Sequence, residues 1–397
     1  MTSRHAITAV AIANCLGSRN EVVFARAFDG SDGFRPATAF FAFPFETELG
    51  VMDLHDEENG DDWAGCAPTR LARVALASAR QITGAVQAAI ERWGARRVAY
   101  VFSSSTGGLE QTERHLAPHP SLAGGLHFDY AYADHGIDAT VAAFARRLGA
   151  RGLQASVSTA CSSGLKALAT AARFIEHDLA DAVVVASADS LCRTTIFGFA
   201  SLGLLAPTAT RPFGRDRCGI TLGEGSAYLL LERKSPETAR QALGWLAGLG
   251  ARTDAFHQTS PHPEGVGAEL AMRQALGRAG LEVADLDLVL AHATGTRLND
   301  AVEGAALGRL LGTAVPVTAT KSLTGHTLGS SGLTALVLAV EALRRQEIPA
   351  TLRADPVDPS LGLTVISERT AARLDQVLVN AFGFGGSNAS AVVSVHA

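Results

Sequence analysis

Cys161 is the strongest candidate for a nucleophile in this sequence. It stands in SVSTACSSGLKALATAARF, where residues 156–160 have the character of a strand end and an amphipathic helix begins at Ser163. Unpaired backbone N–H groups and the helix dipole meet at such a position, so we expect them to lower the pKa of the thiol and favour the thiolate. Gly164 would permit a sharp turn from strand to helix. We interpret the other cysteines as small apolar side chains without a catalytic role: Cys15, Cys66, Cys192 and Cys218.

Two histidines have settings that suit a nucleophilic thiol, which needs partners that move protons or stabilise charge. His292 ends the apolar run LDLVLAH and precedes a turn of small residues, and His326 lies in the glycine- and hydroxyl-rich run TKSLTGHTLGSSG. Lys321 stands five residues before His326. We expect Lys321 to pair with Asp300 or Glu303 in the helix predicted after His292, and so to support the site without touching substrate. We interpret most of the other histidines as surface or core residues.

The sequence predicts no metal centre and no nucleotide-binding loop. It contains no Cys-x-x-Cys pair, and Pro118 interrupts the helical spacing of His115 and His119. A zinc site at Cys161 and the two candidate histidines would lack a fourth ligand. The glycine-rich run FGFGGSN at residues 382–388 follows a strand but leads into another strand, whereas a phosphate loop leads into a helix.

Composition restricts the class of protein further. The chain has 397 residues, 47% hydrophobic and 18% charged, with a formal net charge of −5, which excludes disorder and gives no general attraction to nucleic acid. Five cysteines form no disulfide framework and indicate a reducing, cytoplasmic setting. We interpret the apolar start of the chain as a buried strand and not as a signal peptide. No apolar run reaches the ~18 residues of a membrane span, so we expect no membrane contact.

Strand-like runs alternate with longer amphipathic segments, which predicts parallel strands in an α/β layered fold. The strand-like runs are residues 97–102, 182–187, 227–232, 286–292 and 377–380. The helical segments are residues 70–93, 163–177, 267–280, 300–311 and 332–345.

A faint internal repeat accompanies this alternation. CSSGLKAL at residues 161–168 matches GSSGLTAL at 329–336, at an offset of 168 (329 − 161). GEGSAYLLL at residues 223–231 matches GGSNASAVV at 385–393, at an offset of 162 (385 − 223). Two matches in the same order favour a duplication over chance. We predict two similar halves, 1–245 with the candidate nucleophile and 246–397 with the two candidate histidines.

Four motifs occur in an order that resembles one enzyme family. They are TACSSG at residues 159–164, HATGT at 292–296, KSLTGH at 321–326 and FGFGGSN at 382–388. Together they are similar to the elongating β-ketoacyl-acyl-carrier-protein synthases of type II fatty-acid and polyketide synthesis. The similarity is firm from about residue 97 to the C-terminus and loose before it.

The resemblance implies a thiolase fold, in which two βαβαβαββ halves form five layers (αβαβα), usually in a homodimer. It implies a decarboxylative Claisen condensation with no bound cofactor, on substrates carried by the phosphopantetheine of an acyl carrier protein. Cys161 would hold the acyl chain as a thioester. His292 and His326 would assist decarboxylation of a malonyl thioester, and Lys321 would organise the site with Glu303 and Asp300.

The resemblance also implies substrate contacts around the thiol. Thr294 and Thr296 would bind pantetheine. The backbone N–H groups of Cys161 and Phe384 would form an oxyanion hole, and the Phe384 ring would gate the acyl pocket. The remaining residues assigned to substrate binding are Phe199 and Thr106.

Departures from the family pattern leave alternatives open. Ala293 replaces the usual glycine, and Thr106 replaces a bulkier apolar residue at the pocket floor, which suggests a differently shaped pocket, suited to a rigid polyene chain. Gly203 stands where relatives have a basic residue for carrier docking, so docking would rely on Arg70, Arg73 or Arg215. A non-enzyme alternative is a chain-length-factor-like subunit that shapes the pocket of a heterodimer, although such relatives lose the cysteine. A thiolase proper would need a second cysteine near the C-terminus, and none is present.

Overall fold

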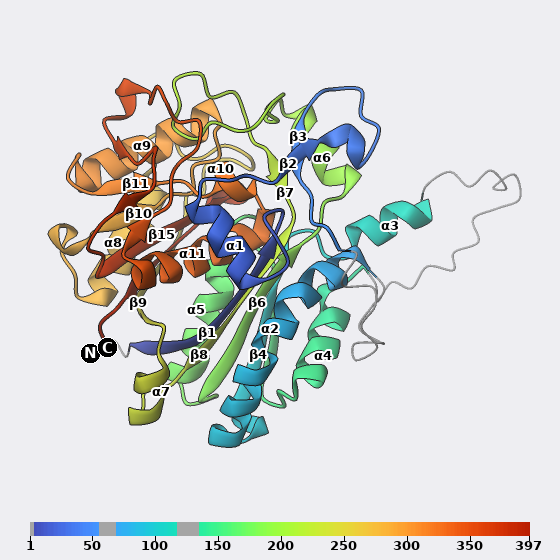
Figure 1. Ribbon diagram of the computed structural model, residues 1–397, viewed down its shortest axis with the longest axis vertical. Helices are drawn as coiled ribbons and strands as arrows, with labels where there is room; N and C mark the ends of the chain where they lie inside the picture. Colours follow the sequence, from blue (N-terminus) through green and yellow to red (C-terminus); the bar gives the residue numbers. More distant parts are fainter. Residues whose placement is uncertain (1–3, 55–68, 117–134) are drawn as a thin grey trace, which may run out of the picture.

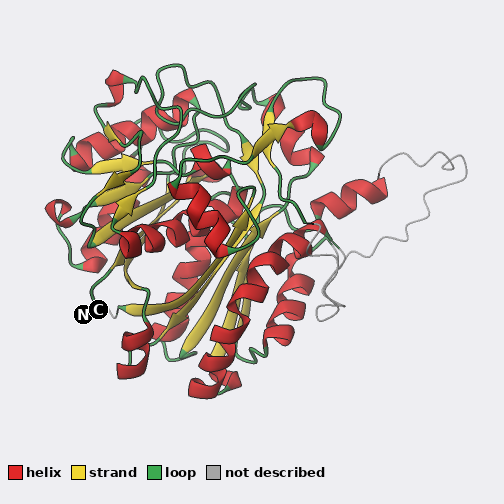
Figure 2. Ribbon diagram, viewed as in Figure 1, coloured by secondary structure: helices red, strands yellow, loops and turns green. Residues whose placement is uncertain are grey.

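The computed structural model describes residues 4–54, 69–116 and 135–397. Cys66, Pro118 and His119 therefore lie outside the described residues. Within the described part of the chain, eleven strands form one sheet, in the order β13-β11-β10-β15-β16-β9-β1-β8-β6-β4-β5. Figure 2 shows strands enclosed by helices. The sheet consists of two arms, which meet where β1 and β9 pair in antiparallel fashion.

The two arms have the same topology. In the first arm β1 pairs with β8 and β8 with β6 in antiparallel fashion, and β6-β4 and β4-β5 are parallel. The second arm repeats each step in the order β9, β16, β15, β10 and β11. The first-arm strands are β1 (His5–Asn14), β4 (Val98–Ser103), β5 (Gln154–Val157), β6 (Ala182–Asp189) and β8 (Gly225–Glu232). Those of the second arm are β9 (Gly244–Thr253), β10 (Leu288–Leu290), β11 (Pro316–Thr318), β13 (Thr364–Val365), β15 (Gln376–Gly383) and β16 (Ser387–Ser394).

Helices cover both faces of each arm (Figure 1). The buried side chains of α2 (Arg70–Trp93) and α4 (Ile137–Leu148) form one core with the outer face of the first arm. Those of α8 (Val266–Ala279) and α9 (Arg297–Leu311) do the same for the second arm. Between the arms lie α5 (Ser163–Glu176) and α11 (Ser331–Arg345), within a third core. This arrangement confirms the predicted thiolase fold, with duplicated halves in five layers.

Burial on both faces explains why the central strands are apolar throughout. In β6, Val183 and Val185 pack into the middle core, whereas Val184 packs into the outer core with α2 and α4. A strand covered on one face only would alternate apolar and polar residues.

Smaller elements surround the layers. The helices are α1 (Asn20–Phe28), α3 (Leu109–Leu116), α6 (Arg193–Ser201), α7 (Pro236–Gln241) and α10 (Lys321–Thr324). A three-stranded sheet contains β2 (Phe34–Pro36), β3 (Glu48–Gly50) and β7 (Leu222–Gly223), and a two-stranded sheet contains β12 (Glu347–Ile348) and β14 (Thr370–Ala371). None of the described helices has an apolar stretch of the length that crosses a bilayer.

The two copies of the sequence repeat start the two central helices, α5 and α11. A Cβ on Gly164 would lie 2.9 Å from the backbone nitrogen of Leu333, and a Cβ on Gly332 would lie 3.0 Å from Cγ of Leu165. The matched glycines therefore let α5 and α11 approach each other closely. The division at 245/246 falls near the start of β9 and stays a prediction.

Candidate active site

Cys161 lies in the turn between β5 and α5, two residues before the helix begins. The preceding Ala160 makes this turn, with a φ of +52° in the left-handed region that most side chains avoid. The expectation that Gly164 permits the turn is wrong, because Gly164 lies inside α5 and its missing side chain makes room for α11.

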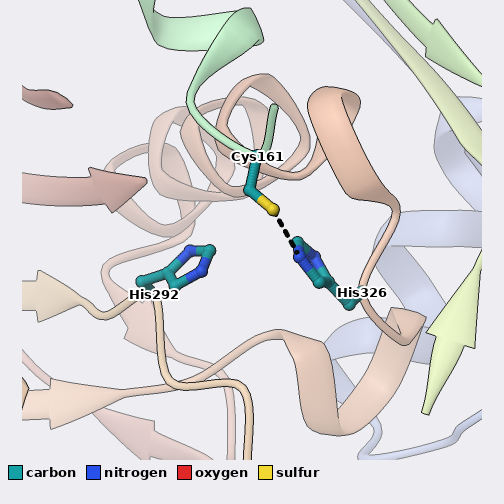
Figure 3. Close-up of side chains that lie close together, drawn as sticks. All are labelled: Cys161, His292 and His326. Carbon is teal, nitrogen blue, oxygen red and sulfur yellow. Dashed lines mark hydrogen bonds between the residues drawn. The ribbon is translucent and has the colours of Figure 1, made fainter. Parts of the chain in front are cut away.

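Three candidate side chains from distant segments converge (Figure 3). Sγ of Cys161 lies 3.1 Å from Nε2 of His326, which follows α10. The ring of His292, which follows β10, lies edge-on to the ring of His326 with 5.4 Å between centroids. All three side chains are buried.

Lys321 contacts His292, not the carboxylate that we expected. Its ammonium donates a hydrogen bond to the carbonyl oxygen of His292 and lies 3.3 Å from Nδ1 of the same residue. Glu303 accepts hydrogen bonds from the backbone N–H groups of His292 (2.8 Å) and Ala293 (2.6 Å). Asp300 accepts from Phe213 N–H and Gly295 N–H. The predicted ion pair is thus replaced by separate contacts, which hold the His292 turn from two sides.

The contact with Lys321 fixes the tautomer of His292. A lysine ammonium only donates hydrogen bonds, so Nδ1 of His292 must be the acceptor. Burial and the charge of Lys321 lower the pKa of His292 well below its ordinary value, so the ring is neutral near pH 7. Its one N–H is therefore on Nε2, where it is available as a hydrogen-bond donor. Burial lowers the pKa of Lys321 itself to about 8, which leaves it largely charged at pH 7.

The expected low pKa of the Cys161 thiol is wrong. Burial raises the pKa of this thiol to about 11, and the opposing effects of Lys321 and of backbone N–H groups are smaller. Burial and Lys321 also lower the pKa of His326 well below its ordinary value. Near pH 7 the resting pair is therefore a neutral thiol, which donates to Nε2 of a neutral His326. That imidazole is placed to accept the thiol proton as the sulfur attacks.

Two backbone N–H groups influence the thiol. Hydrogen bonding from the backbone of Phe384 and of Cys161 itself lowers the pKa of the thiol. The loop at Phe384 lies close to the nucleophile turn, because a Cβ on Gly383 would be 3.0 Å from the nitrogen of Cys161. These are the two groups that the sequence resemblance assigned to an oxyanion hole.

A small cavity of about 80 Å³ opens beside the thiol, with Cys161 and both histidines in its wall. Phe199 on α6 and Phe384 also line it, and their rings stack with 5.5 Å between centroids. The stacked rings are part of the wall beside the thiol, where the sequence resemblance placed the Phe384 gate.

The threonines expected to bind substrate differ in their placement. Thr294 and Thr296 both line the cavity, and their hydroxyl oxygens are 3.1 Å apart. Thr296 also caps α9 by accepting from the Asn299 N–H. The hydroxyl of Thr106 instead donates to Asp189 at 2.8 Å, and Thr106 is not among the described residues in the cavity wall. Its role at a pocket floor stays a prediction.

Two residues of the site were not assigned a role from the sequence, although Phe382 begins the FGFGGSN motif. Asp189, at the end of β6, is fully buried and accepts from backbone N–H groups of Ser105, Thr106 and Ser330. It thereby joins the loop after β4 to the loop after His326. Phe382 packs against the His292 ring with 5.9 Å between centroids.

Two further residues from the sequence analysis, Arg70 and Ala293, have contacts or conformations that bear on their expected roles. Arg70 forms an ion pair with the buried Glu224, which competes with a role in carrier docking, and docking through Arg70, Arg73 or Arg215 stays a prediction. Ala293 has a φ of +30°, a backbone conformation that glycine adopts without the strain of a Cβ, in line with the glycine that the resemblance led us to expect there.

The donor set does not favour a metal ion. The sulfur of Cys161 and a nitrogen from each histidine lie within 4.8 Å of one another, so three donors converge. A cation at their centre would be repelled by the Lys321 ammonium next to His292. A structural zinc site would also need a fourth ligand.

A buried thiol, two imidazoles and an ammonium, set between the halves of a duplicated five-layer fold, define the thiolase-fold class. Two family models match the chain, the β-ketoacyl synthase N-terminal domain over residues 54–237 and the C-terminal domain over residues 243–355. The 3-oxoacyl-[acyl-carrier-protein] synthase 2 of Synechocystis is 30% identical over 97% of this chain and 96% of its own length. The corresponding synthase of Mycobacterium tuberculosis is 39% identical over 58% of each chain.

Solved structures agree with these relatives. A chain in the structure of the ketosynthase ApeO in complex with its chain length factor ApeC, from Xenorhabdus doucetiae, has 33% identity and a TM-score of 0.87, covering 99% of this chain and 98% of that one. The ishigamide ketosynthase/chain length factor has 25% identity and a TM-score of 0.89, with full coverage of both chains. The chain therefore belongs to the β-ketoacyl synthase family.

Proposed function

We propose that this protein joins an acyl group, held as a thioester on Cys161, to the two-carbon unit of malonyl-acyl-carrier protein. The products are a β-ketoacyl-acyl-carrier protein and CO₂, in fatty-acid or polyketide elongation. The observation that carries the proposal is the distance of 3.1 Å from the Cys161 sulfur to Nε2 of His326, with His292 beside the pair. No bound cofactor is needed, because the phosphopantetheine arm of the carrier brings both substrates.

In the first step the thiol attacks the acyl thioester. His326 accepts the proton as the bond from sulfur to the acyl carbon forms, and the carbonyl oxygen becomes an oxyanion. The N–H groups of Cys161 and Phe384 donate to this oxygen, and fixed donors of this kind are worth about 3–4 kcal/mol in a dry site. Collapse of the intermediate expels the pantetheine thiolate, which takes up the proton, and the carrier leaves.

In the second step the malonyl thioester loses CO₂, and the electrons of the broken C–C bond form an enolate. The Nε2–H of His292 donates to the enolate oxygen, and the His326 ring lies beside it. Thr294 and Thr296 orient the pantetheine arm. The enolate carbon then attacks the acyl carbonyl on Cys161, and the sulfur leaves as a thiolate. One proton from solvent, relayed by Nε2 of His326, restores the thiol. Lys321 supports this step by fixing the tautomer of His292.

We also propose that the protein acts in a dimer and receives its substrates from an acyl carrier protein. β5 is the last strand of the described sheet at that edge, so its outer side has unpaired backbone groups that another subunit can use. The partner is either a second copy or a chain-length-factor-like subunit, since two similar structures are named as complexes with a chain length factor. Light scattering of the protein alone and with such a subunit tests this point.

Intact-mass measurement tests the reaction. We expect incubation with acyl-carrier protein to add one acyl mass to the wild type and none to Cys161→Ala. Addition of malonyl-carrier protein should then release a β-ketoacyl-carrier protein. Absence of the adduct at every chain length would favour the alternative function, a pocket-shaping subunit without catalysis.

A panel of acyl chain lengths also tests the hypothesis of a pocket suited to a rigid polyene chain. Preference for short saturated chains alone would contradict that hypothesis.

A further inference from the structure

Lys166 lies on the first turn of α5, just after the nucleophile turn, and it has no part in the reaction proposed above. Its ammonium donates a hydrogen bond of 2.6 Å to the hydroxyl of Ser387. Ser387 directly follows the short helix Phe384–Gly386 and begins β16. Lys166 thus connects the helix that follows Cys161 to the loop that carries Phe384.

A second hydroxyl extends this connection to the nucleophile turn. The hydroxyl oxygens of Ser387 and Ser162 lie 2.7 Å apart, and the hydroxyl of Ser162 donates to the carbonyl oxygen of Thr159 at 2.8 Å. Ser162 is fully buried and is the neighbour of Cys161 in the sequence. Three consecutive hydrogen bonds therefore run from Lys166 to the turn.

The two ends of the chain fix its direction. The carbonyl oxygen of Thr159 only accepts, so Ser162 donates to it and accepts from Ser387, whose remaining acceptor site is filled by Lys166. Without the ammonium, the Ser387 hydroxyl would lose the donor that holds it on the side of α5. Hydrogen bonds from a charged donor are also about twice as strong as neutral ones.

Lys166 is not engaged elsewhere. It is half-buried, and none of the ion pairs among residues 4–54, 69–116 and 135–397 includes it. Its burial lowers its pKa, because no neighbouring charge compensates the lost hydration. The other side of the lysine faces a cleft between α5, β9 and α8.

We propose that Lys166 is a positioning residue, which acts through Ser387 and Ser162 to hold the backbone N–H of Phe384 over the thiol. The proposal rests on the proposed function, in which that N–H is one of the two oxyanion donors for the acyl group. The loop and the turn are in close contact, because a Cβ on Gly383 would lie 3.0 Å from the nitrogen of Cys161. A displacement of about 1 Å in such a site can cost about 100-fold in rate.

Lys166→Met tests the proposal, since it keeps the length of the side chain and removes the donor. We expect the rate of acyl transfer to Cys161 to fall about 10- to 100-fold, with little change in KM. Decarboxylation of malonyl-carrier protein should keep the wild-type rate, because the histidines support that step. Ser387→Ala should act in the same way, and the double variant should lose no more than either single variant. Lys166→Arg should restore most of the rate.

Arg173→Met is the matched control, because Arg173 is two turns further along α5, lines the same cleft and bonds to Thr170 instead of Ser387. It should change neither activity. Equal loss of both activities in Lys166→Met, or unchanged acyl transfer, would overturn the positioning role. A wild-type protein without acyl transfer would overturn the proposed function itself.

Discussion

In the first half of the chain the turn before α5 holds Cys161, whereas the matching position before α11 in the second half holds Gly329. The two turns occupy matching places in the two halves, but the residues packed around them differ. A Cβ on Gly329 would lie 2.8 Å from a carboxylate oxygen of Asp189 and 3.0 Å from the nitrogen of Ser105. The second turn therefore has no room for a side chain. The duplicated fold has two such turns before a central helix, and the packing around them leaves room for a nucleophilic side chain in only one.

The loops after the matched strands β4 and β10 differ in the opposite sense, because here the second half carries the candidate catalytic side chain. In the first half Asp189 accepts the backbone N–H groups of Ser105 and Thr106, and in the second half Glu303 accepts those of His292 and Ala293. Each half thus holds this loop with a buried carboxylate. Only the second loop presents an imidazole, so thiol chemistry and proton handling come from different halves.

Cys161→Ala should have the largest effect on the reaction and should separate the roles of the two halves. Loss of the thiol removes the acyl-enzyme, so we expect condensation to fall by at least about 1000-fold. Decarboxylation of malonyl-carrier protein should persist, because its groups lie in the second half. Rates of CO₂ release and of β-ketoacyl formation measure the two separately. A matched control is Cys192→Ala, which removes a buried cysteine that contacts Thr195 and leaves the site intact. Parallel loss of both rates in Cys161→Ala would contradict the division.

His292→Ala should give the opposite pattern. We expect decarboxylation and condensation to fall about 100-fold or more, since a donor to the enolate is lost. Transfer of the acyl group to Cys161 should stay within a few-fold of wild type, because His326 and the backbone donors remain. Intact-mass kinetics measure this transfer. His177→Ala, on an exposed residue beyond the end of α5, is the control. Slow acyl transfer in His292→Ala would show that the halves are not separable.

Glu303→Gln should have a smaller effect with a distinct dependence on pH. Burial raises the pKa of Glu303 from 4.5 to about 7, so the folded state binds this proton more tightly than the unfolded state. Its contribution to stability is therefore complete below pH 4.5 and is lost as the pH rises to about 7. The variant should lack this decline in melting temperature.

The amide that this substitution introduces would also turn an N–H toward the N–H of Ala293 or His292, so we expect about tenfold slower decarboxylation. Glu21→Gln, at an exposed position of α1, should keep the wild-type pH profile. A Glu303→Gln protein whose stability still falls between pH 4.5 and about 7 would contradict the assignment.

Local patterns in the sequence predicted an α/β layered fold with a repeat, and the resemblance to a known family supplied the thiolase fold. The repeated SSG motif marked the starts of α5 and α11, and turns rich in small and hydroxylated residues singled out His292 and His326. The thiol pKa was mispredicted, because the helix start is local whereas the burial that outweighs it comes from both halves. Asp189 escaped notice for the same reason, since its partners Ser105 and Ser330 lie 84 and 141 residues away.

Gly164→Ala and Gly332→Ala should have the smallest effects on activity, and they compare the packing of the matched glycines in the two halves. A Cβ on Gly164 would press on the backbone of Leu333, which cannot move without shifting α11, whereas a Cβ on Gly332 would meet mainly side chains, those of Ala381 and Leu165. Overpacking of this kind costs about 1–3 kcal/mol, and we expect the larger loss of melting temperature for Gly164→Ala. That variant should also slow acyl transfer a few-fold, because α5 positions Cys161. Gly84→Ala, on open space in α2, is the control. An equal loss of melting temperature in both variants would contradict the prediction, because it would mean that α5 and α11 adjust equally well to a Cβ on either helix.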